Sequence, residues 1–213
     1  MKCYFNRIIF FVINFILILF LSNVYAMDEQ SATDHLLMRI HQVQSYQADF
    51  TQTLVDQALN RKTVSYGTLW VKQPNYFKWE ITSPNKQLLI SNGKTLWNYD
   101  LDLEQVTVQK VPQNISEAPI LLLLRGNPKT LDDLFNIKEI KKGEFSLKPK
   151  SKDQVAIKEI KLYFDKKNLQ KLTIYTSTGQ TTYILFKDYK TTNLDSSFFN
   201  FKAPKGVDVL GGA

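Results

Sequence analysis

The sequence predicts a mainly β protein whose strands form one strongly curved antiparallel sheet, close to a barrel. Residues 67–100 alternate strictly between apolar and polar side chains, with Phe77, Trp79 and Ile81 on one parity. This period of two is typical of a strand with one buried face and one hydrated face. Turn signals recur at short intervals, and no long crossover separates one predicted strand from the next. Strands that are neighbours in the sequence should therefore pair as an antiparallel meander.

The first residues predict a cleaved secretory signal. Lys2 and Arg7 precede an apolar stretch at residues 8–21, and residues 24–26 supply the small side chain that a cleavage site requires. An uncleaved membrane anchor is the alternative, but the stretch has 14 residues with Asn14 inside it. A bilayer requires about 20 apolar residues. No cysteine stands at the cleavage point to carry a lipid anchor, so we expect export in a soluble form.

Removal of residues 1–26 leaves residues 27–213, a length that suits one domain. The only cysteine, Cys3, leaves with the signal, so the mature chain has no disulfide and no thiol chemistry. Its basic excess lies entirely after residue 130, where 15 basic residues face ten acidic ones. Such an excess can attract nucleic acid or an anionic surface. Because these lysines cluster around predicted turns, we interpret them as solvated edges that discourage strand aggregation, and we expect no nucleic-acid partner.

The first element of the mature chain is predicted to be a helix capped by Ser31. Asp34 falls in its first turn, where a negative charge is favourable. The only two histidines, His35 and His41, lie off the apolar stripe, which favours exposed positions over a metal-binding or catalytic role. The stripe comprises Leu36, Leu37, Ile40 and Val43 and extends to Tyr46 at most.

Eleven strands follow, six before an interruption at residues 112–136 and five after it. Each is an apolar or alternating run bounded by residues that favour turns. The turn signals are Pro74-Asn75, Pro84-Asn85, Asn92-Gly93, Lys142-Gly143, residues 165–168 and Thr178-Gly179. The predicted strands span residues 48–55, 64–72, 76–81, 87–91, 95–99, 105–111, 137–142, 144–147, 155–164, 169–175 and 181–188.

The interruption contains a short, very apolar segment. Residues 116–125 begin with a capping serine, an acid and a proline, and Gly126 is placed to end a helix. Such a helix is apolar nearly all round, so it is either a plug that closes the mouth of the sheet or a lid over an apolar cavity. The aliphatic residues of the plug or lid are Ile120, Leu121, Leu122, Leu123 and Leu124. A further small helix is predicted at residues 131–135.

The sequence contains no motif for catalysis, a cofactor or a metal. It has no nucleophile elbow, no phosphate-binding glycine loop and no cysteine and histidine set, so we expect no enzyme, no catalytic residues, no cofactor and no metal. The acidic pairs Asp132-Asp133 and Asp100–Asp102 fall at a helix start and in a hairpin, which favours structural roles. Large residues such as Trp70 and Trp97 either line a ligand cavity or fill the core, and periodicity does not decide between the two.

Six segments in order resemble the periplasmic outer-membrane lipoprotein carrier (LolA) family, over essentially the whole mature chain. The ordered set is more specific than any one segment. The segments are SYQADFTQ (45–52), GTLWVKQP (67–74), FKWE (77–80), SNGKTLWNY (91–99), LEQVTV (103–108) and FNFKAPKGVDV (199–209).

The resemblance implies an unclosed, strongly curved antiparallel β-barrel with an N-terminal helix and short lid helices. It implies a periplasmic chaperone for lipoprotein transport and outer-membrane biogenesis. Such a carrier binds the acyl chains of lipoproteins released by an inner-membrane ATP-binding-cassette complex and delivers them to an outer-membrane receptor. We expect a monomer whose concave interior is apolar, vacant and gated by residues 120–124. The expected lipid-binding residues are Phe50, Leu69, Val71, Phe77, Trp79, Ile81, Leu89 and Trp97.

One position departs from the family pattern. The resemblance implies an arginine before Pro74, where it ties the lid shut by hydrogen bonds to backbone carbonyls, but this chain has Gln73. A glutamine donates two hydrogen bonds yet is neutral and lacks the planar fork of arginine. We expect a looser lid unless Lys78 reaches across to help.

Two other classes of function stay open on the residues alone. One is a non-enzymatic lipid-binding or sensor module of the same fold, or a scaffold that holds no ligand. The other is a secreted hydrolase of unrecognised type, which would have to depend on a carboxylate.

Overall fold

A computed structural model describes residues 28–42, 44–111, 123, 128–151 and 156–212. The predicted signal at residues 1–26, most of the predicted helix at 116–125 and Val43 lie outside the described residues. Among the helices of the described part, none has both the length and the apolar character needed to cross a membrane.

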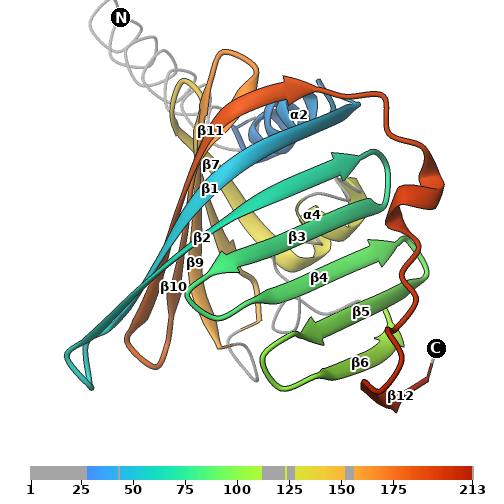
Figure 1. The fold of residues 1–213 in the computed structure, drawn as a ribbon. Coiled ribbons are helices and arrows are strands. Elements are labelled where there is room, and N and C mark those ends of the chain that lie inside the picture. Colours follow the sequence, from blue (N-terminus) through green and yellow to red (C-terminus); the bar gives the residue numbers. More distant parts are fainter. Residues whose placement is uncertain (1–27, 43, 112–122, 124–127, 152–155, 213) are drawn as a thin grey trace, which may run out of the picture.

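Twelve strands form one sheet that curves strongly on itself, and β12 and β7 are its two edges (Figure 1). The sheet order is β12-β6-β5-β4-β3-β2-β1-β11-β10-β9-β8-β7, and every pair except β12 with β6 is antiparallel. The two meanders therefore join where β1 pairs with β11. The strands are β1 (Ser45–Asp56), β2 (Arg61–Lys72), β3 (Tyr76–Ser83), β4 (Gln87–Asn92), β5 (Thr95–Asp100), β6 (Gln105–Lys110), β7 (Phe135–Lys141), β8 (Glu144–Pro149), β9 (Ile157–Asp165), β10 (Asn168–Thr176), β11 (Gln180–Thr191) and β12 (Asp208–Gly211).

All eleven predicted strands are confirmed, and the mainly β, unclosed and strongly curved sheet is as expected. The sequence did not predict β12, a four-residue strand that is exposed throughout and pairs in parallel with β6. A strand that buries neither face shows no alternation between apolar and polar residues, so its sequence carries no signal.

Helix α2 (Asp28–His41) corrects the predicted helix start. Ser31 lies inside the helix rather than at its N-cap, and Tyr46 belongs to β1. The apolar stripe is otherwise confirmed, because Leu36 and Leu37 are buried and Ile40 packs against the core. Helix α4 (Pro128–Leu134) replaces the small helix predicted at residues 131–135 and ends one residue earlier, since Phe135 begins β7.

Both helices lie on the concave side of the sheet, where the core is continuous. Leu36 from α2 and Leu131 from α4 are fully buried and belong to the same apolar cluster as the inward-facing side chains of β1 to β3 and β7 to β11. The concave surface is therefore apolar from one edge of the sheet nearly to the other.

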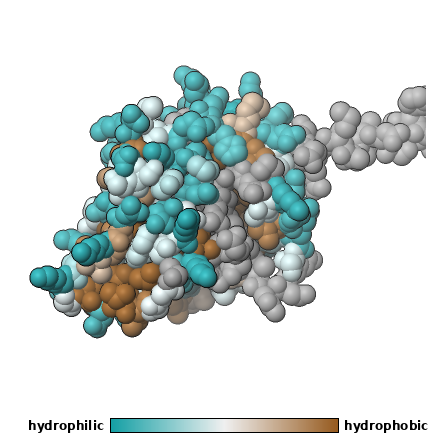
Figure 2. Space-filling view, turned by 90° about the vertical axis from the view of Figure 1, so that its right-hand side faces the viewer, coloured by the Kyte–Doolittle hydropathy of each residue, from teal (hydrophilic) through white to brown (hydrophobic). Residues whose placement is uncertain are grey.

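The C-terminal segment covers part of the outer face. The 3-10 helix η1 (Ser196–Phe199) follows β11, and the chain then runs past β3, β4 and β5 to β12 (Figure 1). Phe201 packs against the rings of Trp97 and Tyr99. Figure 2 views this side and shows hydrophobic residues gathered at its lower left. Val209 and Leu210 of β12 are half exposed.

Helix α2 is fastened to β7 through Glu139. One carboxylate oxygen lies 2.8 Å from His35 Nδ1, and the other accepts a hydrogen bond of 2.8 Å from the Gly143 N–H. Burial opposes ionisation of Glu139, but these hydrogen bonds and the nearby positive charges outweigh it and lower the pKa of Glu139 below its usual value of 4.5.

We expect Glu139→Gln to remove a contribution to stability that depends on pH. A lowered pKa in the folded state stabilises the fold above the unfolded pKa, and this contribution is lost as the pH falls through the folded pKa. The free energy of unfolding should therefore differ between wild type and Glu139→Gln at about pH 7, and the difference should shrink as the pH falls below about 4.5. Urea unfolding across this range measures it; a difference that stays constant contradicts the assignment.

Candidate ligand-binding cavity

Five of the predicted lipid-binding residues form one continuous apolar surface on β1, β2 and β3. Leu69 lies opposite Trp79 and Val71 opposite Phe77 in the β2–β3 pair, and none of the five is more than 6% exposed. The Phe50 ring stacks on Trp79 with centroids 3.8 Å apart, and Phe186 from β11 meets the edge of the Trp79 ring at 6.1 Å. This cross-strand stacking fixes the ring positions in the middle of the concave face.

Ile81 and Leu89 extend this surface toward β4 and are only partly buried, so they mark its margin. Trp97 does not lie there. Its neighbour Leu96 occupies the concave face, so the alternation of β5 turns Trp97 to the outer face, opposite Ile90 and close to Phe201. The expectation that Trp97 lines the same cavity is therefore wrong. Both faces of β5 carry large side chains, and the alternation along a strand does not reveal which face points inward.

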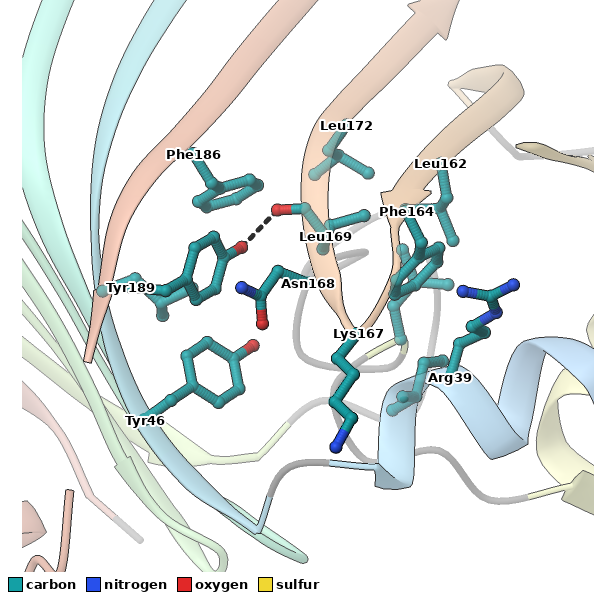
Figure 3. Close-up of a pocket in the computed structure, with 13 residues that line it drawn as sticks. Arg39, Tyr46, Leu162, Phe164, Lys167, Asn168, Leu169, Leu172, Phe186 and Tyr189 are labelled. Atoms are coloured by element: carbon teal, nitrogen blue, oxygen red, sulfur yellow. Dashed lines mark hydrogen bonds between the residues drawn. The ribbon is translucent and has the colours of Figure 1, made fainter. Parts of the chain in front are cut away.

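The described interior is filled rather than vacant. Side chains of α2, α4 and Leu123 occupy the concave side, and the cavity left between α2 and strands β1, β2, β9, β10 and β11 measures only about 40 Å³ (Figure 3). An acyl chain therefore does not fit into this cavity unless side chains move. Of the expected lid residues, Leu123 is described, 5% exposed and part of the cavity wall; Ile120, Leu121, Leu122 and Leu124 lie outside the described residues.

Sequence reasoning missed the wall that the second meander contributes. Leu162, Phe164, Leu172 and Phe186 line the cavity from β9, β10 and β11. In β9 a period of two was available as a signal, because Ile160, Leu162 and Phe164 share one parity and are all buried.

The model of the family described as "Outer membrane lipoprotein carrier protein LolA" matches residues 41–202. The chain belongs to this LolA family. The match begins at the end of α2 and includes β1 to β11, so the whole apolar wall described above lies within it.

Named relatives of the LolA family agree over most of the chain. An outer-membrane lipoprotein carrier protein of Francisella philomiragia is 40% identical over 182 residues, which covers 84% of this chain and 88% of the relative. The protein of the same description from Pseudomonas paraeruginosa is 37% identical over 187 residues, covering 86% and 89%. A solved structure of a LolA superfamily protein from Nitrosomonas europaea has 13% identity and a TM-score of 0.49, covering 83% of this chain and 99% of its own.

Gln73, which replaces the arginine expected for a LolA protein, lies in the turn between β2 and β3. Both polar atoms of its side-chain amide are buried, and neither forms a hydrogen bond with any described residue. Lys78 does not help, because its ammonium group lies on the outer face, 3.0 Å from a Glu80 oxygen and over the Trp70 ring. The side-chain amide of Gln73 is therefore buried without a partner among the described residues.

We expect Gln73→Leu to stabilise the resting fold. It removes a buried amide that has no partner while keeping a side chain of similar size, so the free energy of unfolding should rise by about 1–2 kcal/mol. Gln47→Leu is the matched control, because the Gln47 carbonyl accepts a hydrogen bond of 3.1 Å from the Trp70 indole and its loss should destabilise the fold. Equal effects of both substitutions in urea unfolding contradict this account of Gln73.

The acidic pairs have structural partners, as expected. Asp100 accepts the N–H groups of Asp102 and Leu103 within its hairpin, and Asp132 accepts the Thr33 hydroxyl of α2 at 2.8 Å. Within the described ranges, no group of three or more histidine, cysteine, aspartate or glutamate side chains is arranged to hold a metal ion.

Proposed function

We propose that this protein is a periplasmic carrier that shields the acyl chains of lipoproteins on their way to the outer membrane. The observation that supports this most directly is the continuous apolar concave surface on β1 to β4 within the segment that matches the LolA family. The named relatives are outer-membrane lipoprotein carrier proteins, and they cover nearly the same length of chain. The proposed acyl contacts are Phe50, Leu69, Val71, Phe77, Trp79, Ile81 and Leu89.

The filled resting interior fits a carrier that opens only when it is loaded. Helix α2 and Leu123 occupy the space that acyl chains need, so cargo must displace apolar side chains that already stabilise the empty form. Empty and loaded forms then exchange one apolar filling for another and differ by a modest free energy, which allows release. Loading and unloading are therefore competitions between protein side chains and acyl chains.

Energy considerations require a partner at the loading step. Burying an acyl chain is worth about 0.8 kcal/mol per methylene, so three chains represent on the order of 30 kcal/mol. Single noncovalent complexes level off near about 20 kcal/mol. Because the carrier cannot outcompete a bilayer, we propose that an inner-membrane ATP-binding-cassette complex loads it and an outer-membrane receptor unloads it. Residues 1–26 are proposed to be removed on export, leaving a monomer in the periplasm.

Mass spectrometry of the protein, purified without detergent from the cells that produce it, tests the proposal. A co-purified triacylated lipoprotein is the expected result. Other lipids without any lipoprotein would favour a lipid-binding or sensor module instead. A photocrosslinking residue at position 77, in the middle of the apolar wall, should capture the cargo during release of lipoproteins from spheroplasts, whereas one at position 78, on the outer face, should not.

We expect Gln73→Arg to slow cargo release. If residue 73 closes the lid, a guanidinium donates stronger and more numerous hydrogen bonds to backbone carbonyls than the neutral amide does. A difference of about 1.4 kcal/mol corresponds to about tenfold slower transfer to the receptor. Transfer of a purified, loaded carrier measures the rate, and an unchanged rate refutes the latch role.

A further inference from the structure

One end of the second meander carries a group of basic residues that have no part in the proposed carrier function. The connection between β7 and β8 is Lys142-Gly143, and the connection between β9 and β10 is Lys166-Lys167. Both connections and the end of β11 lie near the top of the molecule in Figure 1, beside α2. We call this group the basic rim, and its members are Arg39, Lys141, Lys142, Lys166, Lys167 and Lys190.

The parts of the basic rim are contiguous. The Phe164 N–H, at the end of β9, donates to the Gly143 carbonyl at 2.8 Å, so the two hairpin ends are neighbours. The Arg39 guanidinium donates to the Lys166 carbonyl and joins α2 to them. Lys190, at the end of β11, lines one surface pocket together with both lysines of the β9–β10 connection. The basic rim is therefore one surface and not three separate clusters.

The lysines of the basic rim are available to a partner. All five are exposed, and none of them forms an ion pair with a described residue. Figure 3 shows the Lys167 side chain extending away from the apolar side chains of Leu172 and Phe186. One of the neighbouring acids, Glu139, is already engaged by His35. The ammonium groups can therefore turn toward an anionic partner.

Much of the net charge of the protein is concentrated at this end. The basic rim has six cationic residues, and the same two hairpin ends carry three acidic ones, Glu139, Glu144 and Asp165, which leaves +3. Without Lys2 and Arg7 the formal charge of +7 becomes +5 for the mature chain, so more than half of it gathers here. Lysines that belong to separate turns in the sequence thus form one positive surface, which attracts anionic surfaces over about one Debye length, about 8 Å at physiological salt.

We propose that the basic rim binds the surface of a bilayer that contains anionic phospholipids, through headgroup phosphates and not through acyl chains. Hairpin tips at one end of a sheet can touch a flat surface together, whereas a nucleic-acid strand binds best in a groove that follows its backbone. Each basic residue near an anionic bilayer strengthens binding about fivefold. The proposal goes beyond the carrier function, because it concerns how the protein approaches a membrane, and its test needs no lipoprotein.

Co-sedimentation of the mature protein with lipid vesicles tests the proposal. Mixed vesicles of phosphatidylcholine and phosphatidylglycerol should bind the protein at low ionic strength, whereas vesicles of phosphatidylcholine alone should not. Binding should be lost at high salt, because the Debye length shortens from about 30 Å at 0.01 M to about 3 Å at 1 M. Lys166→Gln/Lys167→Gln should bind the mixed vesicles about 25-fold more weakly than the wild type, at about fivefold for each lysine.

Lys148→Gln/Lys150→Gln is the matched control. Both lysines are exposed and lie at the end of β8 that is farther from the β7–β8 connection. A strand rises about 3.3 Å per residue, so they lie more than about 10 Å from the basic rim, beyond the Debye length. The control removes the same net charge from the opposite end of the same meander, and its vesicle affinity should stay within about twofold of the wild type.

Several results would overturn the proposal. Equal loss of vesicle binding in the two double variants would show that total charge, and not the basic rim, is responsible. Equal binding to mixed and neutral vesicles, or binding that persists at high salt, would exclude an electrostatic contact with headgroups. Tighter binding of a single-stranded oligonucleotide than of mixed vesicles would assign the basic rim to nucleic acid. None of the substitutions touches the apolar wall, so a protein that carries lipoproteins but fails these tests leaves the proposed function intact.

Discussion

Gly67→Ala is expected to destabilise the fold by about 3 kcal/mol, a large part of the 5–15 kcal/mol that holds a typical domain together. A Cβ at this position would lie 2.0 Å from the Glu80 carbonyl oxygen and 2.5 Å from Phe50 Cζ. Gly67 lies opposite Phe50 in the β1–β2 pair, next to a register shift against β3. The absence of a side chain here lets the Phe50 ring cover the strand and stack on Trp79, so an added methyl group pushes against backbone and ring together.

Urea unfolding of Gly67→Ala at neutral pH measures this effect. Gly212→Ala is the matched control, since nothing lies within 4 Å of a Cβ there, and its free energy of unfolding should change by no more than about 0.5 kcal/mol. Because the clash also displaces Phe50 and Trp79, the surviving folded fraction should bind acyl chains more weakly. A Gly67→Ala protein as stable as wild type would show that the ring stack adjusts freely.

Much of the architecture could be predicted because each strand that buries one face carries a period of two. Phe77, Trp79 and Ile81 show this directly, and their strand lies where the sequence placed it. The elements that escaped prediction lack such a pattern or depend on what lies outside them. β12 buries neither face, and the start of α2 was misplaced because Ser31 has the residue type of a cap without occupying its position.

The candidate site was predictable in its chemistry but not in its closure. The apolar wall follows from the strand pattern, yet whether that wall is empty depends on how α2 and Leu123 pack against it, which is a tertiary contact between distant residues. Trp97 was misassigned because both faces of β5 carry large side chains, and Phe201, which covers its outer face, lies 104 residues further along the chain. The resemblance identified Gln73 as a departure from the family pattern. Only the structure shows that its buried side-chain amide has no hydrogen-bond partner among the described residues.

Leu89→Asn is expected to weaken cargo binding at least about tenfold while leaving the fold intact. Leu89 lies opposite Trp79 on the concave face and is only partly buried in the resting protein, so water still reaches an amide placed there. Once acyl chains cover this margin, the amide loses its water and finds only hydrocarbon. An unpartnered amide in such surroundings costs about 2 kcal/mol or more, which corresponds to more than a tenfold loss of affinity.

Leu88→Asn supplies a control that differs by one position in the same strand. Leu88 has a similar partial exposure, but it lies on the outer face between Glu80 and Tyr99, where no acyl chain is proposed to bind. The two variants should unfold at similar urea concentrations, and only Leu89→Asn should lose the lipoprotein that co-purifies with the wild type. The two substitutions are chemically identical. Equal loss of the lipoprotein from both variants would therefore contradict the assignment of the concave face as the acyl-binding surface. Equal retention of the lipoprotein in both would place the cargo away from the margin formed by β4.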